Sequence, residues 1–231
     1  MRLHNQDTRE APRYGITEAA GYLGVRVATL KSWVQGRSYP TRHSKARFKP
    51  LIHPPSPGML SFFNLVEAHI LLSTRKHHGL TMPAIRHAMD YVAEQFPSPH
   101  PLLTERFLTD GKDLFIRKLE QTIDVTKRGQ LGMGPVLDLY LRRVERDQSQ
   151  LPMRLFPLRA GWVGSAGQEP PRVVVIDPAI SSGTPVVYRT GIMAKILAGR
   201  FRAGEGIEEL ARDYGLQNSE IEEVIRYAPA A

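Results

Sequence analysis

The side chains best suited to chemistry lie in one short stretch near the N-terminus, residues 26–35. Its hydroxyl and amide groups are of the kind that hydrogen-bond to base edges in the major groove of DNA. Its lysine and arginine are of the kind that neutralise phosphates. The stretch therefore predicts DNA contacts from Arg26, Ala28, Thr29, Lys31, Ser32 and Gln35.

Positive charge is concentrated around the same stretch. Residues 1–53 contain ten Lys and Arg against three Asp and Glu. The counts are 14 against 12 in residues 54–170 and seven against eight in residues 171–231. Because the basic charge is local, it fits the electrostatic footprint of a phosphate-binding surface.

Basic residues continue beyond residue 35, among Gly36 and Pro40, which discourage one long helix. We expect a wing here, meaning a charged loop or hairpin that grips the DNA backbone. The alternative is a mobile surface loop with no role in binding. The contacts expected from the wing are Arg37, Arg42, Lys45, Arg47 and Lys49.

These side chains need a scaffold, and residues 14–34 predict two short helices joined by a turn at Gly24. Thr17 is the expected cap of the first helix. An ordinary helical hairpin with a solvated face is the alternative to a DNA-binding pair. The apolar positions expected to pack together are Ala19, Ala20 and Leu23 with Val27, Leu30, Trp33 and Val34.

Two further helices are predicted before the first run of prolines. One extends from Ser61, its cap, to about His77, with His69 packed or hydrogen-bonded inside the protein. The other covers residues 81–96, and its apolar stripe can pack in the core or pair with a second subunit. Helix-turn-helix dimers match two half-sites of DNA, so we expect a homodimer.

The N-terminal pattern resembles the winged helix-turn-helix of the MerR family over about the first 96 residues. One departure is Arg26, which replaces the family's small hydroxyl cap and is left free to touch phosphate. The resemblance implies a DNA-binding domain at residues 1–96. It is carried by Tyr14, Thr17, Ala20, Leu23, Gly24, Val25, Thr29, Leu30 and Trp33, and by the segments 61–66 and 79–86.

Prolines at residues 97–101 mark the first expected domain boundary, and a central α+β region is expected over residues 97–160. The pair Asp110-Gly111 indicates a tight turn between two strands. The elements predicted here are strands at 107–109, 114–116, 123–126 and 153–158, and a helix at 135–146.

The last 60 residues predict a β-hairpin followed by three helices, within a domain at residues 172–231. Val173 to Ile176 is an apolar strand, and 192–201 is the first helix. Gly215 provides the turn into the third helix, where Ser219 and Glu222 are the expected capping box.

This tail resembles the family known as domain of unknown function 433, which occurs as the antitoxin partner of PIN-like toxins. Two departures are Arg189-Thr190-Gly191 in place of Gly-Thr-Arg, and Gly206 in place of a serine cap. The motif includes Asp177-Pro178, Gly183, Pro185-Val186-Val187, Thr190, Ile192, Gly204, Ile207 to Ala211 and Tyr214.

Together the two ends resemble a VapB-type antitoxin, which implies operator DNA and a cognate PIN-like toxin as partners. The acidic side chains of the tail are the candidate toxin contacts, and a solvated acidic face is the alternative. These candidates are Glu205, Glu208, Glu209, Glu222 and Glu223.

Composition excludes other classes of function. The chain has no cysteine, and it contains no apolar run long enough to cross a membrane, so we expect a cytoplasmic protein. The helices and strands predicted above indicate a mostly helical α+β class. Catalytic motifs are missing, and neither a metal nor a cofactor is expected. The competing hypothesis is a solitary MerR-like regulator that responds to a ligand or a partner.

Overall fold

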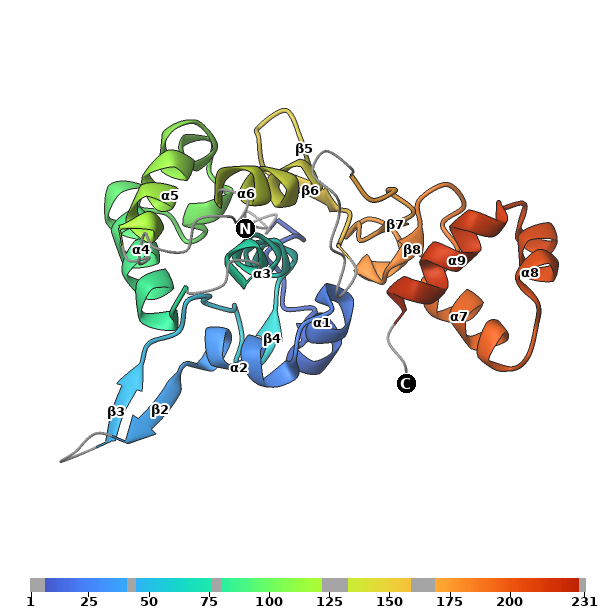
Figure 1. Cartoon of the computed structure of the whole chain (residues 1–231), viewed down its shortest axis with the longest axis horizontal. Helices are drawn as coiled ribbons and strands as arrows, with labels where there is room; N and C mark the ends of the chain where they lie inside the picture. The colour runs from blue at the N-terminus through green and yellow to red at the C-terminus, as the bar shows by residue number, and fades with distance from the viewer. Residues whose placement is uncertain (1–6, 41–44, 76–79, 122–132, 159–168, 229–231) are drawn as a thin grey trace, which may run out of the picture.

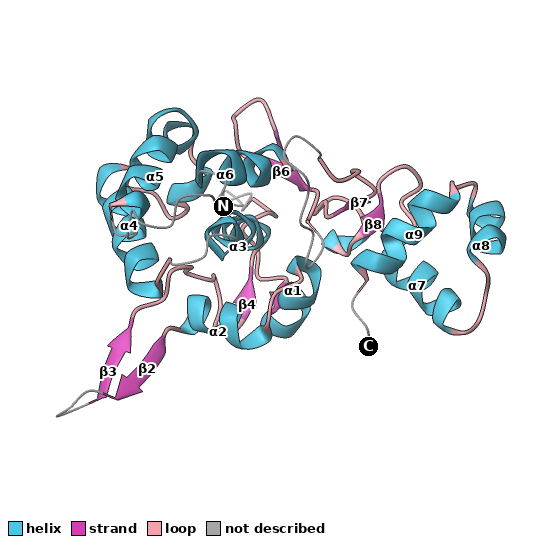
Figure 2. Ribbon diagram, viewed as in Figure 1, coloured by secondary structure: helices cyan, strands magenta, loops and turns pink. Residues whose placement is uncertain are grey.

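The computed structural model describes residues 7–40, 45–75, 80–121, 133–158 and 169–228. Figures 1 and 2 show a helical body, a hairpin that projects from one end and a separate group of helices at the other. The described residues form nine α-helices and four two-stranded antiparallel sheets. The prediction of a mostly helical α+β protein is therefore confirmed.

The predicted helix pair is present as α1 (Ile16–Leu23) and α2 (Val27–Gln35). Gly24 provides the turn, with a left-handed φ of 61°. Thr17 is not the cap, because α1 begins directly after strand β1 (Tyr14–Gly15) and Gly15 takes the N-cap position. Strand β1 pairs with β4 (Met59–Leu60), which ties the helix pair to the body.

Packing between the two helices follows the predicted apolar positions with one exception. Leu30, Trp33 and Val34 of α2 are buried together with the apolar side of α1. Val27, expected to pack as well, is 41% exposed because it is the first residue of α2, ahead of the residues that meet α1. The packing nevertheless turns the polar face of α2 outward.

The segment expected to form the wing is an antiparallel hairpin, and its contact with the DNA backbone stays a prediction. Strand β2 (Arg37–Pro40) pairs with β3 (Lys45–Phe48), with Arg37 opposite Phe48 and Ser38 opposite Arg47. Figure 1 shows the hairpin extending away from the body below α2. Arg42 lies outside the described residues.

The next two helices form as predicted. In α3 (Phe62–Arg75), the hydroxyl of Ser61 accepts a hydrogen bond from the Asn64 backbone N–H at 3.2 Å. In α4 (Met82–Gln95), the hydroxyl of Thr81 caps Ala84 in the same way. The predicted end of the first of these helices, near His77, falls outside the described residues.

The predicted strands at 107–109 and 114–116 are wrong, because this segment is helical. Residues Phe107–Gly111 form a π-helical turn that continues into α5 (Lys112–Glu120), preceded by a 3₁₀ turn at Pro101–Leu103. Gly111 is a packing position and not a hairpin turn, since a Cβ there would meet the ring of Phe96 at 2.9 Å. The predicted strand at 123–126 lies outside the described residues.

The central region ends in a small hairpin. Helix α6 (Met133–Arg142) stops four residues short of its predicted end. It stops because β5 (Val144–Arg146) pairs with β6 (Pro152–Leu155). Strand β6 starts one residue before the expected 153–158 strand and covers its first half.

One continuous core joins the segments on both sides of residue 97. It contains Tyr14 and Leu30 from the N-terminal part and Phe107, Leu137 and Leu155 from the central part. Helix α3 lies at its centre, with α1, α4 and α6 around it (Figure 1). The predicted domain boundary at residue 97 stays a prediction, and the hydrophobic core continues across it.

Residues 171–228, called the C-terminal unit below, have a second core. Strands β7 (Val174–Val175) and β8 (Val186–Val187) pair as the predicted hairpin. The three predicted helices follow as α7 (Ala194–Arg202), α8 (Ile207–Tyr214) and α9 (Asn218–Tyr227).

The expected capping pair of the last helix is shifted by two residues. Glu220 accepts a hydrogen bond from the Gln217 backbone N–H at 2.8 Å, so these residues replace Ser219 and Glu222. The shift follows from the turn at Gly215, which lets α9 begin at Asn218.

The C-terminal unit is attached to α1 and to β6. Leu155 and Ile176 exchange two backbone hydrogen bonds. The hydroxyl of Tyr227 donates to the Tyr22 carbonyl at 2.9 Å, although the two residues are 205 positions apart in the sequence. A short 3₁₀ turn, Ser181–Gly183, packs its glycine directly against the Tyr14 hydroxyl.

Candidate nucleic-acid and partner interfaces

The outer face of α2 contains the side chains that the sequence singled out for base contacts. Ala28 and Gln35 are exposed, while Thr29 and Ser32 are half-buried at the edges of that face. This arrangement follows from helical spacing, since Leu30, Trp33 and Val34 occupy the buried side. The outer face of α2 is accessible from solvent, and its contact with the major groove of DNA stays a prediction.

Cations surround this face. Arg26 and Lys31 are exposed at the start and in the middle of α2, and Arg37 is exposed where the wing, residues 37–49, begins. Lys49, at the other end of the wing, is also exposed. The structure thus brings four of the predicted phosphate contacts to the region of α2 and the wing root. Lys45 and Arg47 are placed by their backbone in β3.

The wing root is tied to three elements of the body. The backbone N–H groups of Leu51 and Ile52 donate to the Trp33 carbonyl of α2, at 2.7 and 3.1 Å. Asn64 of α3 donates to the His53 carbonyl at 3.2 Å. From α4, the Arg86 guanidinium donates to the Lys49 carbonyl. These anchors could not be predicted from the sequence, because each one joins residues that are far apart in the chain.

A buried acid lies close to this root. Glu67 of α3 is 3% exposed, and its carboxylate is 3.0 Å from Nδ1 of His100. Burial raises the pKa of Glu67. Burial opposes protonation of His100, but its hydrogen bond to Glu67 and the charge of Glu67 outweigh that effect and raise its pKa. A cavity of about 110 Å³ adjoins the pair, lined by Glu67, Met89 and Asp90, among others.

His69 is a structural residue, as predicted. Its Nε2 lies 3.1 Å from the Tyr140 carbonyl, and its ring packs on that tyrosine. Complete burial lowers the pKa of His69 to about 3. The ring is therefore neutral and joins α3 to α6.

The acidic candidates of the C-terminal unit fall into two groups. Glu208 and Glu209 are exposed in the first turn of α8. Glu205 pairs with Arg200, while Glu222 and Glu223 pair with Arg226 at 2.5 and 3.7 Å. Partial neutralisation by these arginines leaves the start of α8 as the most strongly acidic part of the predicted contact surface.

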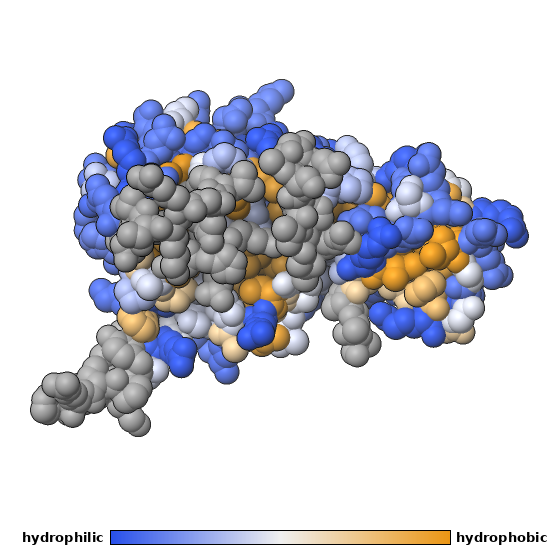
Figure 3. Space-filling model, viewed as in Figure 1, coloured by the Kyte–Doolittle hydropathy of each residue, from blue (hydrophilic) through white to orange (hydrophobic). Residues whose placement is uncertain are grey.

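Exposed apolar side chains are also concentrated in the C-terminal unit. Among the described residues, four large hydrophobic side chains are exposed, and Tyr188 (49%), Ile196 (45%) and Phe201 (36%) belong to this unit. Figure 3 shows an apolar area over α7 and α9. Apolar surface of this kind is common where proteins bind one another.

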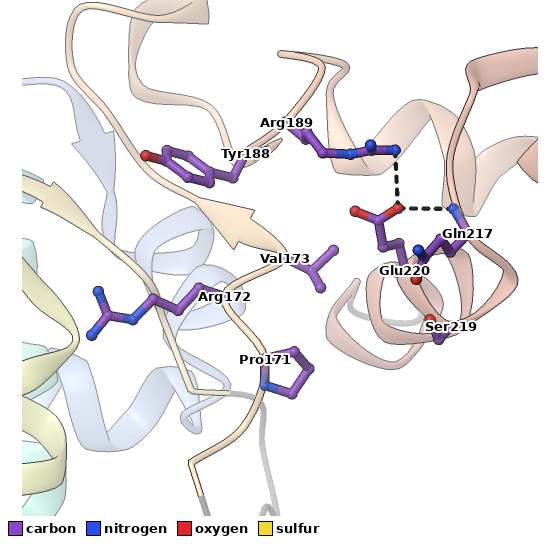
Figure 4. A pocket seen from close by; sticks show the side chains of 8 residues that line it. All are labelled: Pro171, Arg172, Val173, Tyr188, Arg189, Gln217, Ser219 and Glu220. Carbon is purple, nitrogen blue, oxygen red and sulfur yellow. Dashed lines mark hydrogen bonds and ion pairs between the residues drawn. The ribbon is translucent and has the colours of Figure 1, made fainter.

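A cavity of about 500 Å³ opens beside α9. In Figure 4, Val173 points towards Glu220 and Gln217, and Arg189 pairs with Glu220 at 3.4 Å. The guanidinium of Arg172 and the ring of Tyr188 extend away from that pair. Because Arg189 and Glu220 pair with each other, neither positive nor negative charge is concentrated in the cavity.

Other classes of site find little support in the described part of the chain. No group of three or more potential metal-ligating side chains is present there. Within the same residues, no helix has the length and apolar character needed to cross a membrane.

Comparison with known proteins adds three findings. Residues 174–228 match the model of a family described as Protein of unknown function (DUF433), which confirms that part of the predicted resemblance. A Mycobacterium tuberculosis (strain ATCC 25618 / H37Rv) protein named "Putative antitoxin VapB45" is a distant homologue, 26% identical over 234 residues, covering 94% of this chain and 93% of the relative. The crystal structure of Rv2018 from Mycobacterium tuberculosis has the same fold, with a TM-score of 0.64, 24% identity, and coverage of 93% of this chain and 98% of that chain.

Proposed function

We propose that this chain is a non-enzymatic antitoxin of a type II toxin–antitoxin system. It binds operator DNA to regulate its own transcription, and it neutralises a PIN-like ribonuclease toxin by direct contact. One observation carries the proposal: exposed cations surround α2 and the wing root, whereas exposed apolar and acidic side chains gather on the C-terminal unit. The name of the distant homologue supports the antitoxin role.

In the DNA-binding half, α2 enters the major groove. Thr29, Ser32 and Gln35 contact base edges, with Ala28 close to the groove floor. The surrounding cations bind phosphates and fix the register without reading sequence. These phosphate contacts are Arg26, Lys31, Arg37, Arg42, Lys45, Arg47 and Lys49. A homodimer places two such helices on successive half-sites.

In the toxin-binding half, apolar side chains of the C-terminal unit provide the contact area and acids provide steering. Ile196 and Phe201 are exposed on α7, and Glu208 and Glu209 are exposed on α8. Charge complementarity increases the rate of association more than it increases affinity. The proposed acidic contacts are Glu205, Glu208, Glu209, Glu222 and Glu223.

Coexpression with the product of the neighbouring gene tests the toxin-binding half. We expect that product to arrest growth alone, and this chain to relieve the arrest and co-elute with it in size-exclusion chromatography. Relief should be lost with the double variant Ile196→Asp, Phe201→Asp. It should be retained with the double variant Gln95→Asp, Gln121→Asp, which adds the same charge at two exposed positions of the body. Absence of both a complex and relief would refute the antitoxin proposal.

One observation favours the alternative of a solitary ligand-responsive regulator. The 110 Å³ cavity beside Glu67 is also lined by Pro50, Leu51 and His53, which follow the wing. A small molecule bound there would contact the segment that holds the wing root. Operator affinity that changes with a small molecule at fixed salt, and no longer changes in Glu67→Gln, would support this function.

A further inference from the structure

Arg86 of α4 makes two contacts with the end of strand β3. Its Nη1 donates a hydrogen bond to the Lys49 carbonyl, and its guanidinium carbon lies 5.0 Å from the centre of the Phe48 ring. The side chain therefore grips two consecutive residues where the wing returns to the body. Arginine suits this task because one planar group can stack on a ring and donate a hydrogen bond.

Burial makes this contact unusual for a cation. Arg86 is 8% exposed, and its Nε is buried without a hydrogen-bond partner in the described structure. Burial lowers the pKa of the guanidinium, with Asp90, one turn further along α4, acting in the opposite direction. A buried cation is costly unless its contacts compensate. The hydrogen bond to Lys49 and the contact with the Phe48 ring therefore have to offset the cost of burying this charge.

The other side of the root is fixed through α2. Gly36 connects α2 to β2 with a left-handed φ of 74°, and a Cβ at this position would overlap the Phe48 carbonyl. The Trp33 carbonyl holds Leu51 and Ile52 from the same helix. Both strands of the hairpin are therefore fixed where they meet the body. Strand β2 is held by α2, and strand β3 is held by Arg86 of α4.

We propose that Arg86 is a positioning residue that sets the angle of the wing relative to α2, although it touches no DNA itself. The inference about wing order stands on these contacts alone, and its effect on DNA rests on the proposed function. Cations held in place before binding lose less conformational freedom when they meet phosphates. Loosening the root should therefore weaken phosphate binding without altering base preference.

Wing order can be measured directly, because the natural chain has no cysteine. A nitroxide label on Ser38→Cys, an exposed position of β2, reports motion of the wing. A label on Ser219→Cys, exposed on α9, is the reference. We expect Arg86→Met to increase the mobile fraction of the spectrum at residue 38 at least twofold and to leave residue 219 unchanged.

The matched control is Arg106→Met. Its guanidinium also stacks on a ring, that of Phe96 at 5.3 Å, but far from the wing in the chain. Arg86→Lys can still donate to the Lys49 carbonyl and should recover part of the order at residue 38. If Arg86→Met unfolds the chain, Arg86→Lys and Phe48→Leu provide the comparison in folded protein. Identical residue 38 spectra in wild type and in all folded variants at positions 86 and 48 would overturn the proposal.

A DNA titration separates this inference from the proposed function. With random-sequence duplex at two salt concentrations, Arg86→Met should lower affinity about tenfold and reduce the salt dependence, as losing a phosphate contact does. Ordered wing spectra that loosen in Arg86→Met, together with no DNA binding by wild type, would refute the DNA-binding proposal and leave the positioning role intact. Unchanged DNA affinity despite a loosened wing would overturn the role of wing order in binding.

Discussion

The molecule contains two helix pairs with nearly the same backbone and different surfaces. Helices α1 and α8 are both eight residues long, begin after a glycine N-cap and end at a left-handed glycine, Gly24 with φ 61° and Gly215 with φ 63°. The helices that follow, α2 and α9, have nine and ten residues. The turn geometry alone therefore does not distinguish a DNA-binding helix pair from another kind.

The surfaces of the second helices make the distinction. Helix α2 has Lys31 and no acidic side chain, with Arg26 immediately before it. Helix α9 contains three glutamates, two of which pair with Arg226. A phosphate backbone would be attracted by the first helix and repelled by much of the second. Two helix pairs of the same geometry can therefore suit different partners, and the charge of the exposed side chains determines which partner each pair attracts.

Gly183 of the C-terminal unit packs on Tyr14 of β1, and breaking this contact should have the largest effect. Gly183→Ala adds a Cβ against Tyr14 and forces a left-handed φ of 74° on alanine, so we expect a loss of about 3 kcal/mol in unfolding free energy. Gly191→Ala, with φ 72° and open space around it, should lose only about 1 kcal/mol. Chemical denaturation measures both. Equal losses would show that contact with Tyr14 contributes nothing.

Acid should weaken the body more than the C-terminal unit. His69 stays neutral when folded, with its pKa near 3, whereas the unfolded chain protonates it near 6.5. The neutral His69 therefore contributes fully to the free energy of unfolding above pH 6.5. This contribution is lost as the pH falls towards 3, by up to about 1.4 kcal/mol per pH unit. The C-terminal unit has no histidine.

Denaturation at pH 7 and pH 5 checks this, with His69→Gln as the comparison. The variant should show a smaller decrease between the two values, because its side chain does not titrate. The difference between the two proteins also removes the contribution of His100, whose raised pKa acts in the opposite direction. The same decrease in both proteins would exclude His69 as the source.

Removing wing cations should weaken DNA binding uniformly. We expect the double variant Lys45→Ala, Arg47→Ala to lower affinity for operator and random DNA alike, and to reduce the salt slope by about one for each lost phosphate contact. Thr29→Ala and Ser32→Ala should instead change sequence preference by about 1 kcal/mol. Gel-shift titrations at two salt concentrations separate the two patterns. Similar losses on both DNAs for all four substitutions would contradict this division of roles.

The smallest expected effect concerns steering by α8. Glu208→Lys with Glu209→Lys should slow association with the toxin about threefold at low salt and have little effect at high salt. Glu120→Lys, an exposed charge change on α5, is the control. Stopped-flow mixing measures the rates. An association rate in the double variant equal to that of the control would remove these acids from the interface.

Sequence patterns predicted the two helix pairs because their signals are local. Gly24 and Gly215 mark left-handed turns, and apolar residues at helical spacing identify the buried sides. The same patterns failed at Asp110-Gly111, where a turn signal sits inside a helix. The glycine is required there by the ring of Phe96, a neighbour that no local pattern reveals.

Some residues of the candidate DNA-binding surface could be placed from the sequence, and others could not. Helical spacing placed Thr29, Ser32 and Gln35 on the outer side of α2. The basic residues among Gly36 and Pro40 indicated where the wing lies in the chain. It did not identify Arg86, since an isolated arginine in an amphipathic helix normally extends into solvent. Nor did it predict the ion pairs of Glu222 and Glu223 with Arg226, which reduce the acidity inferred from a count of residues.

The bond from Tyr227 to Tyr22 has a practical consequence for dissecting the protein. Deleting the C-terminal unit would not release a self-sufficient N-terminal fragment, because α1 would lose this bond and Tyr14 would lose its cover at Gly183. The truncated chain would expose apolar surface beside α1 and would be prone to aggregate. Proteolysis that removes the C-terminal unit in a cell would, for the same reason, shorten the lifetime of the remaining N-terminal part.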